Sequence, residues 1–191
     1  MTVLETKRDK GMTARRWARR FFVSATVFYR KSPPHRELID VNGVIKGILT
    51  LLDSEVARAS VKVGAQLAAD LPEIMADRVQ VQQVFMNLKL NAIEAMKSSG
   101  GELIVQSQIQ DSKALFSISD TGVGLPTEKV EQIFSAFFTT KAQGSGMGLA
   151  ISRSIVESHG GRLWAIFNGQ KGATFQFTMP TEVSESTALA V

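Results

Sequence analysis

One long helix, expected over residues 77–97, constrains the fold of this chain more than any other feature of its sequence. At about 100° per residue, its apolar side chains fall on two neighbouring arcs. Asp77 is a residue type that caps the first turn of a helix. A helix with so wide an apolar surface is buried between a sheet and a second helix. The arc that remains is polar and carries Gln80, Gln83, Asn87, Asn91 and Glu94.

The flanking segments predict the sheet and the other helices. Apolar patterns indicate strands at 36–40, 61–67, 102–110, 114–119, 162–167 and 174–179. Asn42 is expected to cap a helix that runs to residue 52, and a third helix is expected at 147–158. Residues 111–113 fit a hairpin turn, so the strands beside them pair antiparallel. We expect an α/β fold, a two-layer sandwich in which a mixed, mainly antiparallel sheet of about five strands carries about three helices on one face.

Charge divides the chain into two parts. Residues 1–36 carry ten Lys or Arg and two Asp or Glu, and residues 37–191 carry twelve and sixteen, so the net charges are +8 and −4. The run Lys31–Pro34 reads as a linker between them. We interpret the basic segment as a solvated helix or tail, with contact to nucleic acid or an anionic membrane as the alternative. The expected domains are a basic N-terminal segment and linker at 1–35, a main domain at 36–180 and a flexible tail at 181–191.

Composition excludes several classes of function. The chain has no cysteine, which rules out disulfides, thiolate metal sites and cysteine nucleophiles. No apolar run approaches the roughly 20 residues that span a bilayer, and no segment fits a cleavable signal peptide. We therefore expect a cytoplasmic protein without a transmembrane segment.

A glycine-rich, irregular section follows the expected hairpin and carries the first candidate site residues. Asp120 stands at the end of a strand, and an ionised carboxylate accepts hydrogen bonds, so it could receive the exocyclic amine of adenine. Gly122 and Gly124 let the backbone turn sharply and approach a ligand. An Asp that caps a turn is the alternative, and these residues alone leave both interpretations open.

A second glycine-rich run, Gly144–Leu149, opens the expected helix at 147–158. Backbone N–H groups at such a helix start attract phosphate. No Gly-Lys-Ser/Thr follows and no strand leads directly into the run, so neither a Walker A loop nor a dinucleotide fingerprint is indicated. Three aromatic residues within 133–138 would pin the loop between the two runs onto the domain. Lys141 could reach a terminal phosphate or stay solvated.

Two further features of the long helix bear on function and stability. Asn87 and Asn91 are four residues apart and point the same way, which suits an ion or phosphate site because Asn supplies an uncharged oxygen ligand; a solvated edge is the alternative. Lys89 falls between the two apolar arcs. Because an unpaired buried ammonium is costly, either its head reaches water beyond an apolar stem or the site is strained. We expect Lys89→Leu to stabilise the fold.

Taken in order, these segments resemble the conserved boxes of the histidine-kinase ATPase family. The resembling segments are residues 87–95 (Asn-Leu-Lys-Leu-Asn-Ala-Ile-Glu-Ala) for its N box, 120–124 (Asp-Thr-Gly-Val-Gly) for its G1 box, 133–138 for its F box, 144–149 (Gly-Ser-Gly-Met-Gly-Leu) for its G2 box and 172–175 (Gly-Ala-Thr-Phe) for its G3 segment. The match covers residues 36–180 and looks most like the nitrogen-regulatory and oxygen-sensing branch of these kinases.

This resemblance implies the Bergerat (GHKL) fold with ATP and Mg²⁺ as cofactors. It implies that Asn91 ligates the metal and that Asn87 lies beside it. Asp120 would read adenine with help from Thr174. Lys141 would approach the γ-phosphate and, with the two asparagines, serve catalysis. It also implies an ATP lid at 125–146 and further nucleotide contacts from Glu94, Gly122, Gly124, Gly144, Ser145, Gly146, Met147, Gly148 and Leu149.

The resemblance therefore implies the ATP-binding half of a protein histidine kinase. Hydrolytic relatives carry a Glu general base where this chain has Asn87, and an amide cannot abstract a proton from water. His35 is not on an amphipathic helix and His159 ends one, so the γ-phosphate would pass to a histidine outside this chain. The implied partners are a histidine-bearing dimerisation domain or partner kinase and, indirectly, a response regulator; nucleic acid is not expected. A non-catalytic ATP-binding module and a serine kinase of the anti-sigma-factor type are the alternatives.

Overall fold

The computed structural model describes residues 34–51, 53–125, 131–139, 145–169 and 171–181. The chain divides into two compact units, Met1–Pro34 and His35–Val191, and the second unit contains the fold. Most of the basic segment, residues 1–33, and the tail at 182–191 lie outside the described residues. What the sequence predicts for these two segments therefore stays a prediction.

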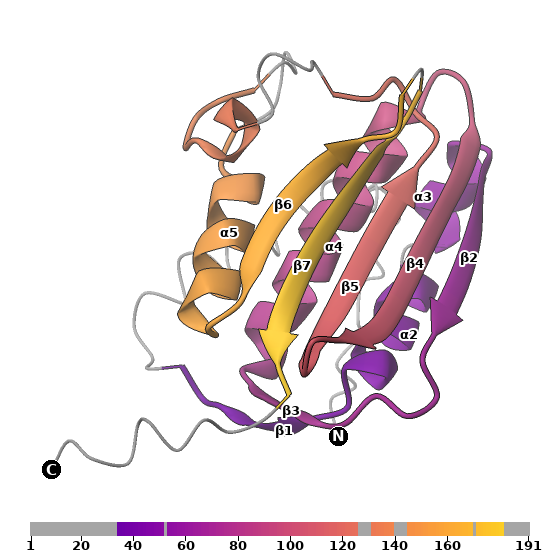
Figure 1. The fold of residues 1–191 in the computed structure, drawn as a ribbon. Coiled ribbons are helices and arrows are strands. Elements are labelled where there is room, and N and C mark those ends of the chain that lie inside the picture. Colours follow the sequence, from indigo (N-terminus) through magenta and orange to yellow (C-terminus); the bar gives the residue numbers. More distant parts are fainter. Residues whose placement is uncertain (1–33, 52, 126–130, 140–144, 170, 182–191) are drawn as a thin grey trace, which may run out of the picture. The chain divides into compact units, whose positions relative to one another are not determined.

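The second unit is built on a five-stranded sheet with the strand order β2-β4-β5-β7-β6 (Figure 1). Its strands are β2 (Val61–Leu67), β4 (Gly101–Gln110), β5 (Lys113–Asp120), β6 (Arg162–Phe167) and β7 (Ala173–Pro180). β2 pairs parallel with β4, and the other three pairings are antiparallel. Two short strands, β1 (Glu37–Ile39) and β3 (Ile74–Ala76), pair antiparallel in a separate sheet. The predicted mixed, mainly antiparallel sheet is confirmed.

Helices cover one face of this sheet, as Figure 1 shows. They are α2 (Val41–Leu51), α3 (Asp53–Arg58), α4 (Arg78–Ala95) and α5 (Gly148–Ser158), with a short 3₁₀ helix at Gln132–Phe134. The predicted two-layer α/β sandwich is therefore confirmed. The sequence did not predict α3, because its six residues are too few for a helical apolar period to stand out. No helix in the described part of the chain is long and apolar enough to cross a bilayer.

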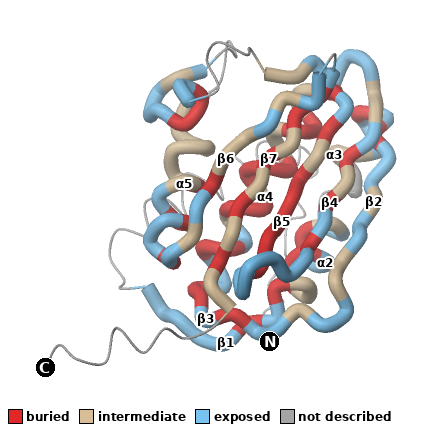
Figure 2. The backbone as a smooth tube through the Cα atoms, in the orientation of Figure 1, coloured by how far each residue is buried: buried red, intermediate tan, exposed pale blue. Residues whose placement is uncertain are grey.

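α4 packs against the centre of the sheet, where Figure 2 shows buried residues in both layers. The ring of Phe85 lies edge-on to the rings of Phe116 in β5 and Phe177 in β7, with centroids 5.5 and 5.1 Å away. Phe116 and Phe177 stack on each other at 5.0 Å. Each such pair adds about 0.5–1.5 kcal/mol beyond the burial of its surface. The apolar arcs of the long helix are thus buried as predicted, except at Met86 and Leu90, which are partly exposed, and at Val79, which is 58% exposed.

The turn between β4 and β5 has the geometry of a tight hairpin. Asp111 and Ser112 have positive φ angles of 50° and 57°, and Gln110 pairs with Lys113 across the turn. A two-residue turn with two positive φ angles matches the right-handed twist of the strands that it joins. The turn predicted at 111–113 is therefore confirmed, although Lys113 already belongs to β5.

Asn42 does not cap α2, so that prediction is wrong. α2 begins at Val41, one residue before Asn42, and Asp40 accepts the hydrogen bond from the backbone N–H of Gly43 at 2.9 Å. Asn42 instead joins α2 to the sheet: its Nδ2 donates to the carbonyl oxygen of Ala68, and its Oδ1 accepts from Oγ of Ser107, both at 2.8 Å. Asp and Asn both favour cap positions. The tertiary partners of Asn42, which the sequence does not show, decide between them.

Lys89 is buried to its charged end, so of the two alternatives that the sequence left open, a head that reaches water is wrong. The residue is 2% exposed. Its Nζ donates to the carbonyl oxygens of Leu49 and Ile48, at 2.8 and 3.2 Å. Both carbonyls belong to the last turn of α2, where backbone oxygens lack partners within the helix and a cation is favoured by the helix dipole. The lysine therefore caps α2 from the neighbouring helix.

Candidate functional site

The polar edge of α4 faces α5 and is partly buried. Asn87 is 8% exposed, and its Nδ2 donates to the carbonyl oxygen of Gly148 and to Oγ of Ser152, both at 3.1 Å. A backbone carbonyl can only accept a hydrogen bond, so the amide nitrogen must be the atom that faces α5. The side-chain oxygen of Asn87 is then the atom available to a ligand. The structure thus places Asn87 beside Gly148, two predicted site residues that are far apart in sequence.

Asn91 and Glu94 follow Asn87 on the same edge of α4 and are partly exposed. Glu94 forms an ion pair with Lys97, with 3.7 Å between its Oε1 and Nζ. An ion pair this exposed contributes little to stability. Asn91 and Glu94 therefore line the edge of α4 from Asn87 toward its C-terminal end, with oxygen atoms suited to a hard cation.

Asp120 is buried at the end of β5, on the face of the sheet that carries the helices. Its Oδ1 accepts the backbone N–H of Gly122 at 2.9 Å. Burial raises the pKa of the Asp120 carboxyl, and the hydrogen bonds from the N–H groups of Gly122 and Ala173 act against that rise. A carboxylate held in this way still has lone pairs for one further donor. The geometry is compatible with the adenine-reading role that the resemblance implies.

Gly122 and Gly172 let backbone segments of the protein pack on each other. A Cβ at Gly122 would lie 2.6 Å from the carbonyl oxygen of Ala95, in the last turn of α4. Gly172, at φ +83°, donates its N–H to the carbonyl oxygen of Gly122 at 2.8 Å, and a Cβ there would collide with the backbone of Asp120. These glycines therefore hold Asp120 against the end of α4. Gly122, which the sequence predicts to permit a close approach to a ligand, here permits a close approach to α4.

Thr174 and Asp120 lie on opposite faces of the sheet. Asp120 pairs with Ala173, and Thr174 pairs with Ser119. Because successive residues of a strand point to opposite faces, the Thr174 side chain turns away from Asp120. Its Oγ1 lies 2.8 Å from Oγ of Ser119 and donates to Oδ1 of Asn168 at 3.0 Å. The structure does not bring Thr174 to the Asp120 carboxylate, and Ala173 occupies the position opposite it.

The three aromatic residues at 133–138 are expected to hold their loop on the domain, and two of them do so. Phe134 is buried, 6.4 Å from Phe175 of β7 between ring centroids, and Phe138 packs partly buried against the core. Phe137 is 75% exposed. The guanidinium of Arg153 in α5 lies 4.0 Å from the centroid of Phe134. The segment is therefore anchored on both α5 and the sheet.

The same segment is joined to the second glycine-rich run by a backbone contact. The N–H of Phe137 donates to the carbonyl oxygen of Gly146 at 3.1 Å, and both residues have positive φ angles. A Cβ at Gly146 would lie 2.7 Å from the Cα of Phe137. Gly146 thus permits the aromatic segment to meet the start of α5.

The second glycine-rich run is described in part. Ser145 Oγ accepts the N–H of Met147 at 3.4 Å, and Met147 is the residue before α5. Leu149 is partly buried and packs against the core. Lys141 and Gly144, like residues 126–130 of the expected lid, lie outside the described residues. Their predicted contacts with phosphate stay predictions.

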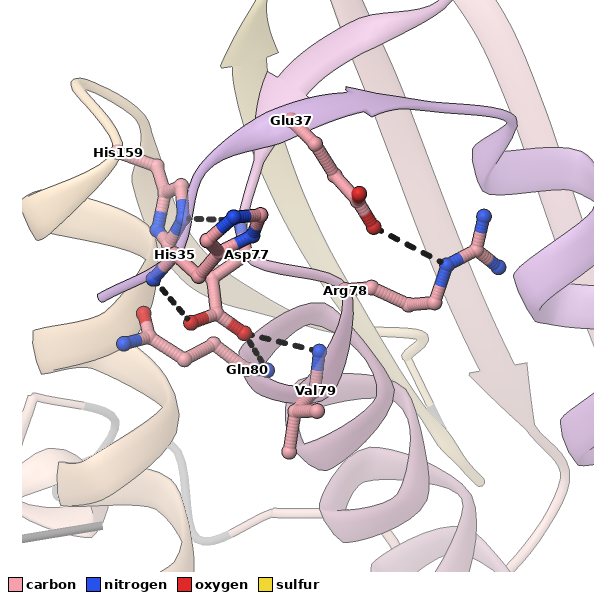
Figure 3. Close-up of polar contacts among 7 residues, drawn as sticks. All are labelled: His35, Glu37, Asp77, Arg78, Val79, Gln80 and His159. Carbon is pink, nitrogen blue, oxygen red and sulfur yellow. Dashed lines mark hydrogen bonds and ion pairs between the residues drawn. The ribbon is translucent and has the colours of Figure 1, made fainter. Parts of the chain in front are cut away.

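The two histidines hold structural positions beside the start of α4 (Figure 3). Nε2 of His159 accepts the backbone N–H of Asp77 at 3.1 Å, and its Nδ1 lies 2.8 Å from the carbonyl oxygen of Ile155. Both ring nitrogens of His159 are thus engaged, and the residue is buried. The backbone N–H of His35 donates to Oδ2 of Asp77 at 3.1 Å. Neither histidine stands on an exposed helix face in this structure.

Sequence reasoning missed Ser152 and Arg153, which hold Asn87 and Phe134 in place. Oγ of Ser152 contacts Asn87, and Arg153 bridges the Phe134 ring and Oε2 of Glu131, the latter at 3.0 Å. Ser152 lies four residues after Gly148 and so on the same helix face. This four-residue spacing is the feature of the sequence from which the role of Ser152 could have been predicted. For Arg153 the sequence holds no comparable sign, because its partners come from a segment about twenty residues earlier.

A family model built on known proteins covers most of these site residues. The family model described as "Histidine kinase-, DNA gyrase B-, and HSP90-like ATPase" matches residues 76–183. That range includes the polar edge of α4, Asp120, the aromatic segment and α5.

Individual relatives agree with the family match. The chain is 45% identical to the sensor protein FixL of Bradyrhizobium diazoefficiens over 136 residues, which are 70% of this chain and 26% of FixL. The catalytic domain of the histidine kinase ThkA matches with a TM-score of 0.69 and 34% identity, over 77% of this chain and 96% of that domain. A structure of ThkA with the response regulator protein TrrA matches with a TM-score of 0.73 and 27% identity, over 97% of this chain and 54% of the matched chain.

Proposed function

The chain belongs to the family of histidine kinase-, DNA gyrase B- and HSP90-like ATPases and carries the ATP-binding catalytic domain of a sensor histidine kinase, and we propose that it uses Mg-ATP to phosphorylate a histidine outside this chain. The chain spans about a quarter of FixL and most of the ThkA catalytic domain. The acceptor and the sensory parts of such a kinase are therefore assigned to other segments or partners.

The orientation of Asn87 is the observation that carries this proposal. Its amide nitrogen donates to the carbonyl oxygen of Gly148, so a carboxylate at this position would face that carbonyl oxygen and be repelled. The edge of α4 is thus built for an amide, which cannot act as a general base on water. This supports transfer of the γ-phosphate to a protein acceptor over its hydrolysis.

Within this proposal, the nucleotide lies between the two glycine-rich segments. Asp120 accepts the exocyclic amine of adenine, while backbone N–H groups from Gly146 to Leu149 approach the phosphates at the start of α5, where the helix dipole favours negative charge. Lys141 would reach the γ-phosphate. Thr174 is left out of these contacts, because its hydroxyl is engaged on the other face of the sheet.

Mg²⁺ fits the donor set along α4. Asn91 would hold it through the side-chain oxygen with Asn87 beside it, and amide oxygens are hard ligands that Mg²⁺ accepts. Among the described residues, no three of His, Cys, Asp and Glu are grouped as a metal site. Such a setting suits a cation that keeps most of its bonds to ATP phosphates and water. When bound, the ion would neutralise charge on those phosphates.

The proposed partners follow from this chemistry. The phosphate would pass to a histidine on a dimerisation domain or partner kinase and from there to a response regulator; ThkA, a structural relative, has been crystallised with such a regulator. We propose a cytoplasmic location, where ATP and these partners would meet. The named relatives are a sensor protein and a histidine kinase, and they favour neither a non-catalytic module nor an anti-sigma-type serine kinase.

Phosphotransfer tests this function directly. The full chain is incubated with Mg²⁺ and γ-labelled ATP, with and without a separately supplied histidine-bearing dimerisation domain from a FixL-like kinase. We expect acid-labile, base-stable label on the supplied domain and none on this chain. Release of inorganic phosphate with no labelled histidine would instead identify a hydrolytic ATPase. ATP binding without turnover of any kind would identify a non-catalytic module.

A further inference from the structure

Ser152 of α5 is completely buried, with 0% exposure, yet it carries a hydroxyl. Its Oγ donates to the carbonyl oxygen of Gly148, one turn earlier in the helix, at 2.9 Å. A serine hydroxyl has a single proton. Once that proton is given to Gly148, the contact between Ser152 Oγ and Nδ2 of Asn87, at 3.1 Å, can form only with the amide as donor.

The three hydrogen bonds therefore form a closed network in which the donor and the acceptor of each bond are fixed. Nδ2 of Asn87 has two protons, and its two acceptors are the Gly148 carbonyl oxygen and Ser152 Oγ. The amide cannot be turned over without setting its oxygen against a carbonyl oxygen. Both protons of Nδ2 are donated to acceptors in α5, so the side-chain oxygen of Asn87 is held pointing away from α5.

Packing alone gives no reason for a hydroxyl at position 152. Other buried residues of α5 include the apolar Ile155 and Val156, and an alanine would fit the same helix without a polar atom to satisfy. A buried hydroxyl costs free energy unless it is hydrogen-bonded. Its acceptor capacity is used by Asn87, which links the polar edge of α4 to the start of α5.

We propose that Ser152 is a positioning residue that orients the Asn87 amide so that its oxygen faces the metal–phosphate side of the site. The inference rests on the proposed function and adds to it a residue outside every motif that the sequence resemblance covers. Without Ser152, one proton of Nδ2 loses its acceptor and only the Gly148 carbonyl oxygen still opposes rotation of the amide, so the side-chain oxygen is held less firmly against exchange with the N–H₂ group. An N–H₂ group repels a cation and cannot bind it.

Calorimetric titration of the full chain with the non-hydrolysable analogue AMP-PNP tests this role. Wild type, Ser152→Ala and Ser152→Thr are each titrated in Mg²⁺ and in EDTA. Ser152→Ala should weaken binding in Mg²⁺ by about three- to tenfold, the factor that one neutral hydrogen bond is worth, and have a smaller effect in EDTA. Ser152→Thr keeps the hydroxyl and should recover most of the affinity. Ser117→Ala, another buried serine, which accepts from Gln176, is the matched control.

A double-mutant cycle separates positioning from loss of structure. If Ser152 acts through the amide, Ser152→Ala should have no further effect on affinity in an Asn87→Ala background. The side-chain amide signal of Asn87 in nitrogen-15 NMR spectra should also shift, and its protons exchange faster, in Ser152→Ala without nucleotide. A uniform loss of affinity that persists in the Asn87→Ala background would contradict the inference and assign Ser152 a structural role.

The two proposals fail in different ways. A wild-type chain that binds Mg-AMP-PNP, beside a Ser152→Ala variant with equal affinity and an unchanged Asn87 signal, overturns the positioning role alone. A wild-type chain with no Mg²⁺-dependent nucleotide binding overturns the proposed function, and the positioning role with it.

Discussion

The backbone N–H of Asp77 donates to Nε2 of His159 at 3.1 Å, which joins the start of α4 to the residue that follows α5. Ten residues further along α4, Asn87 contacts Gly148 at the start of α5. The two helices therefore run antiparallel and are joined by hydrogen bonds at both ends of α5. Because candidate metal and phosphate residues come from these two helices, the cross-links fix their relative positions.

The first prediction concerns Asp77, whose carboxylate accepts three backbone N–H groups, including that of His35 (Figure 3). Asp77→Ala should lower the free energy of unfolding by about 1–2 kcal/mol, the upper range for loss of a helix cap. Urea denaturation followed by circular dichroism measures the change. Asp70→Ala, at an exposed position, should change stability by less than about 0.5 kcal/mol. Equal stability of the two variants would show that the cap contributes nothing.

The second prediction concerns Lys89. Lys89→Met keeps most of the apolar stem but removes the donor to the carbonyl oxygens of Ile48 and Leu49. We expect a loss of about 1–3 kcal/mol, because those carbonyls are left without this partner, and this reverses the expectation from the sequence that Lys89→Leu stabilises. Thermal unfolding, with the exposed Lys46→Met as control, decides the sign. A raised melting temperature would mean that the cost of burying the ammonium outweighs its hydrogen bonds.

The third prediction concerns the pH dependence that Asp120 contributes. Burial raises the pKa of this carboxyl in the folded chain above its ordinary value of 3.8, so between these two values the folded state binds more protons than the unfolded state. The contribution of Asp120 to stability is therefore largest at low pH and is lost as pH rises through the raised pKa. Denaturant titrations from pH 4 to 7 should show wild type losing stability relative to Asp120→Asn. A difference that stays constant with pH would contradict the assigned shift.

Asp120 also links pH to nucleotide recognition. Only the ionised carboxylate is purely an acceptor, so ATP affinity should rise with pH through the same raised pKa. Calorimetric titrations over that range check this, with Asp120→Asn as the variant that should lack the pH dependence. Equal pH profiles for the two proteins would assign the effect to another group.

The sequence was sufficient where a local pattern and the tertiary structure agree. Asp77 stands directly before a long periodic segment, and residues 61–67 alternate in polarity; both elements appear where expected. Asp111 and Ser112 adopt the left-handed turn conformation that short polar side chains tolerate. In each case the residues that determine the structure are neighbours in the chain.

The sequence was insufficient where partners from distant segments decide. Asn42 looks like a cap but bonds to Ala68 and Ser107. Thr174 looks like a partner of Asp120, but the strand register places Ala173 there. A shift of one residue along a strand moves a side chain to the other face, and neither the order nor the spacing of motifs specifies register at that precision.

Binding of Mg-ATP to the edge of α4 is the central claim, and Asn91 tests it most directly. Wild type, Asn91→Ala and the exposed control Gln82→Ala are titrated calorimetrically with ATP in the presence of Mg²⁺ and again in EDTA. The predicted result is a loss of more than about tenfold in Mg²⁺-dependent affinity for Asn91→Ala, the scale on which perturbed metal ligation is felt, and none for Gln82→Ala. Unchanged affinity of Asn91→Ala in Mg²⁺ would contradict the account.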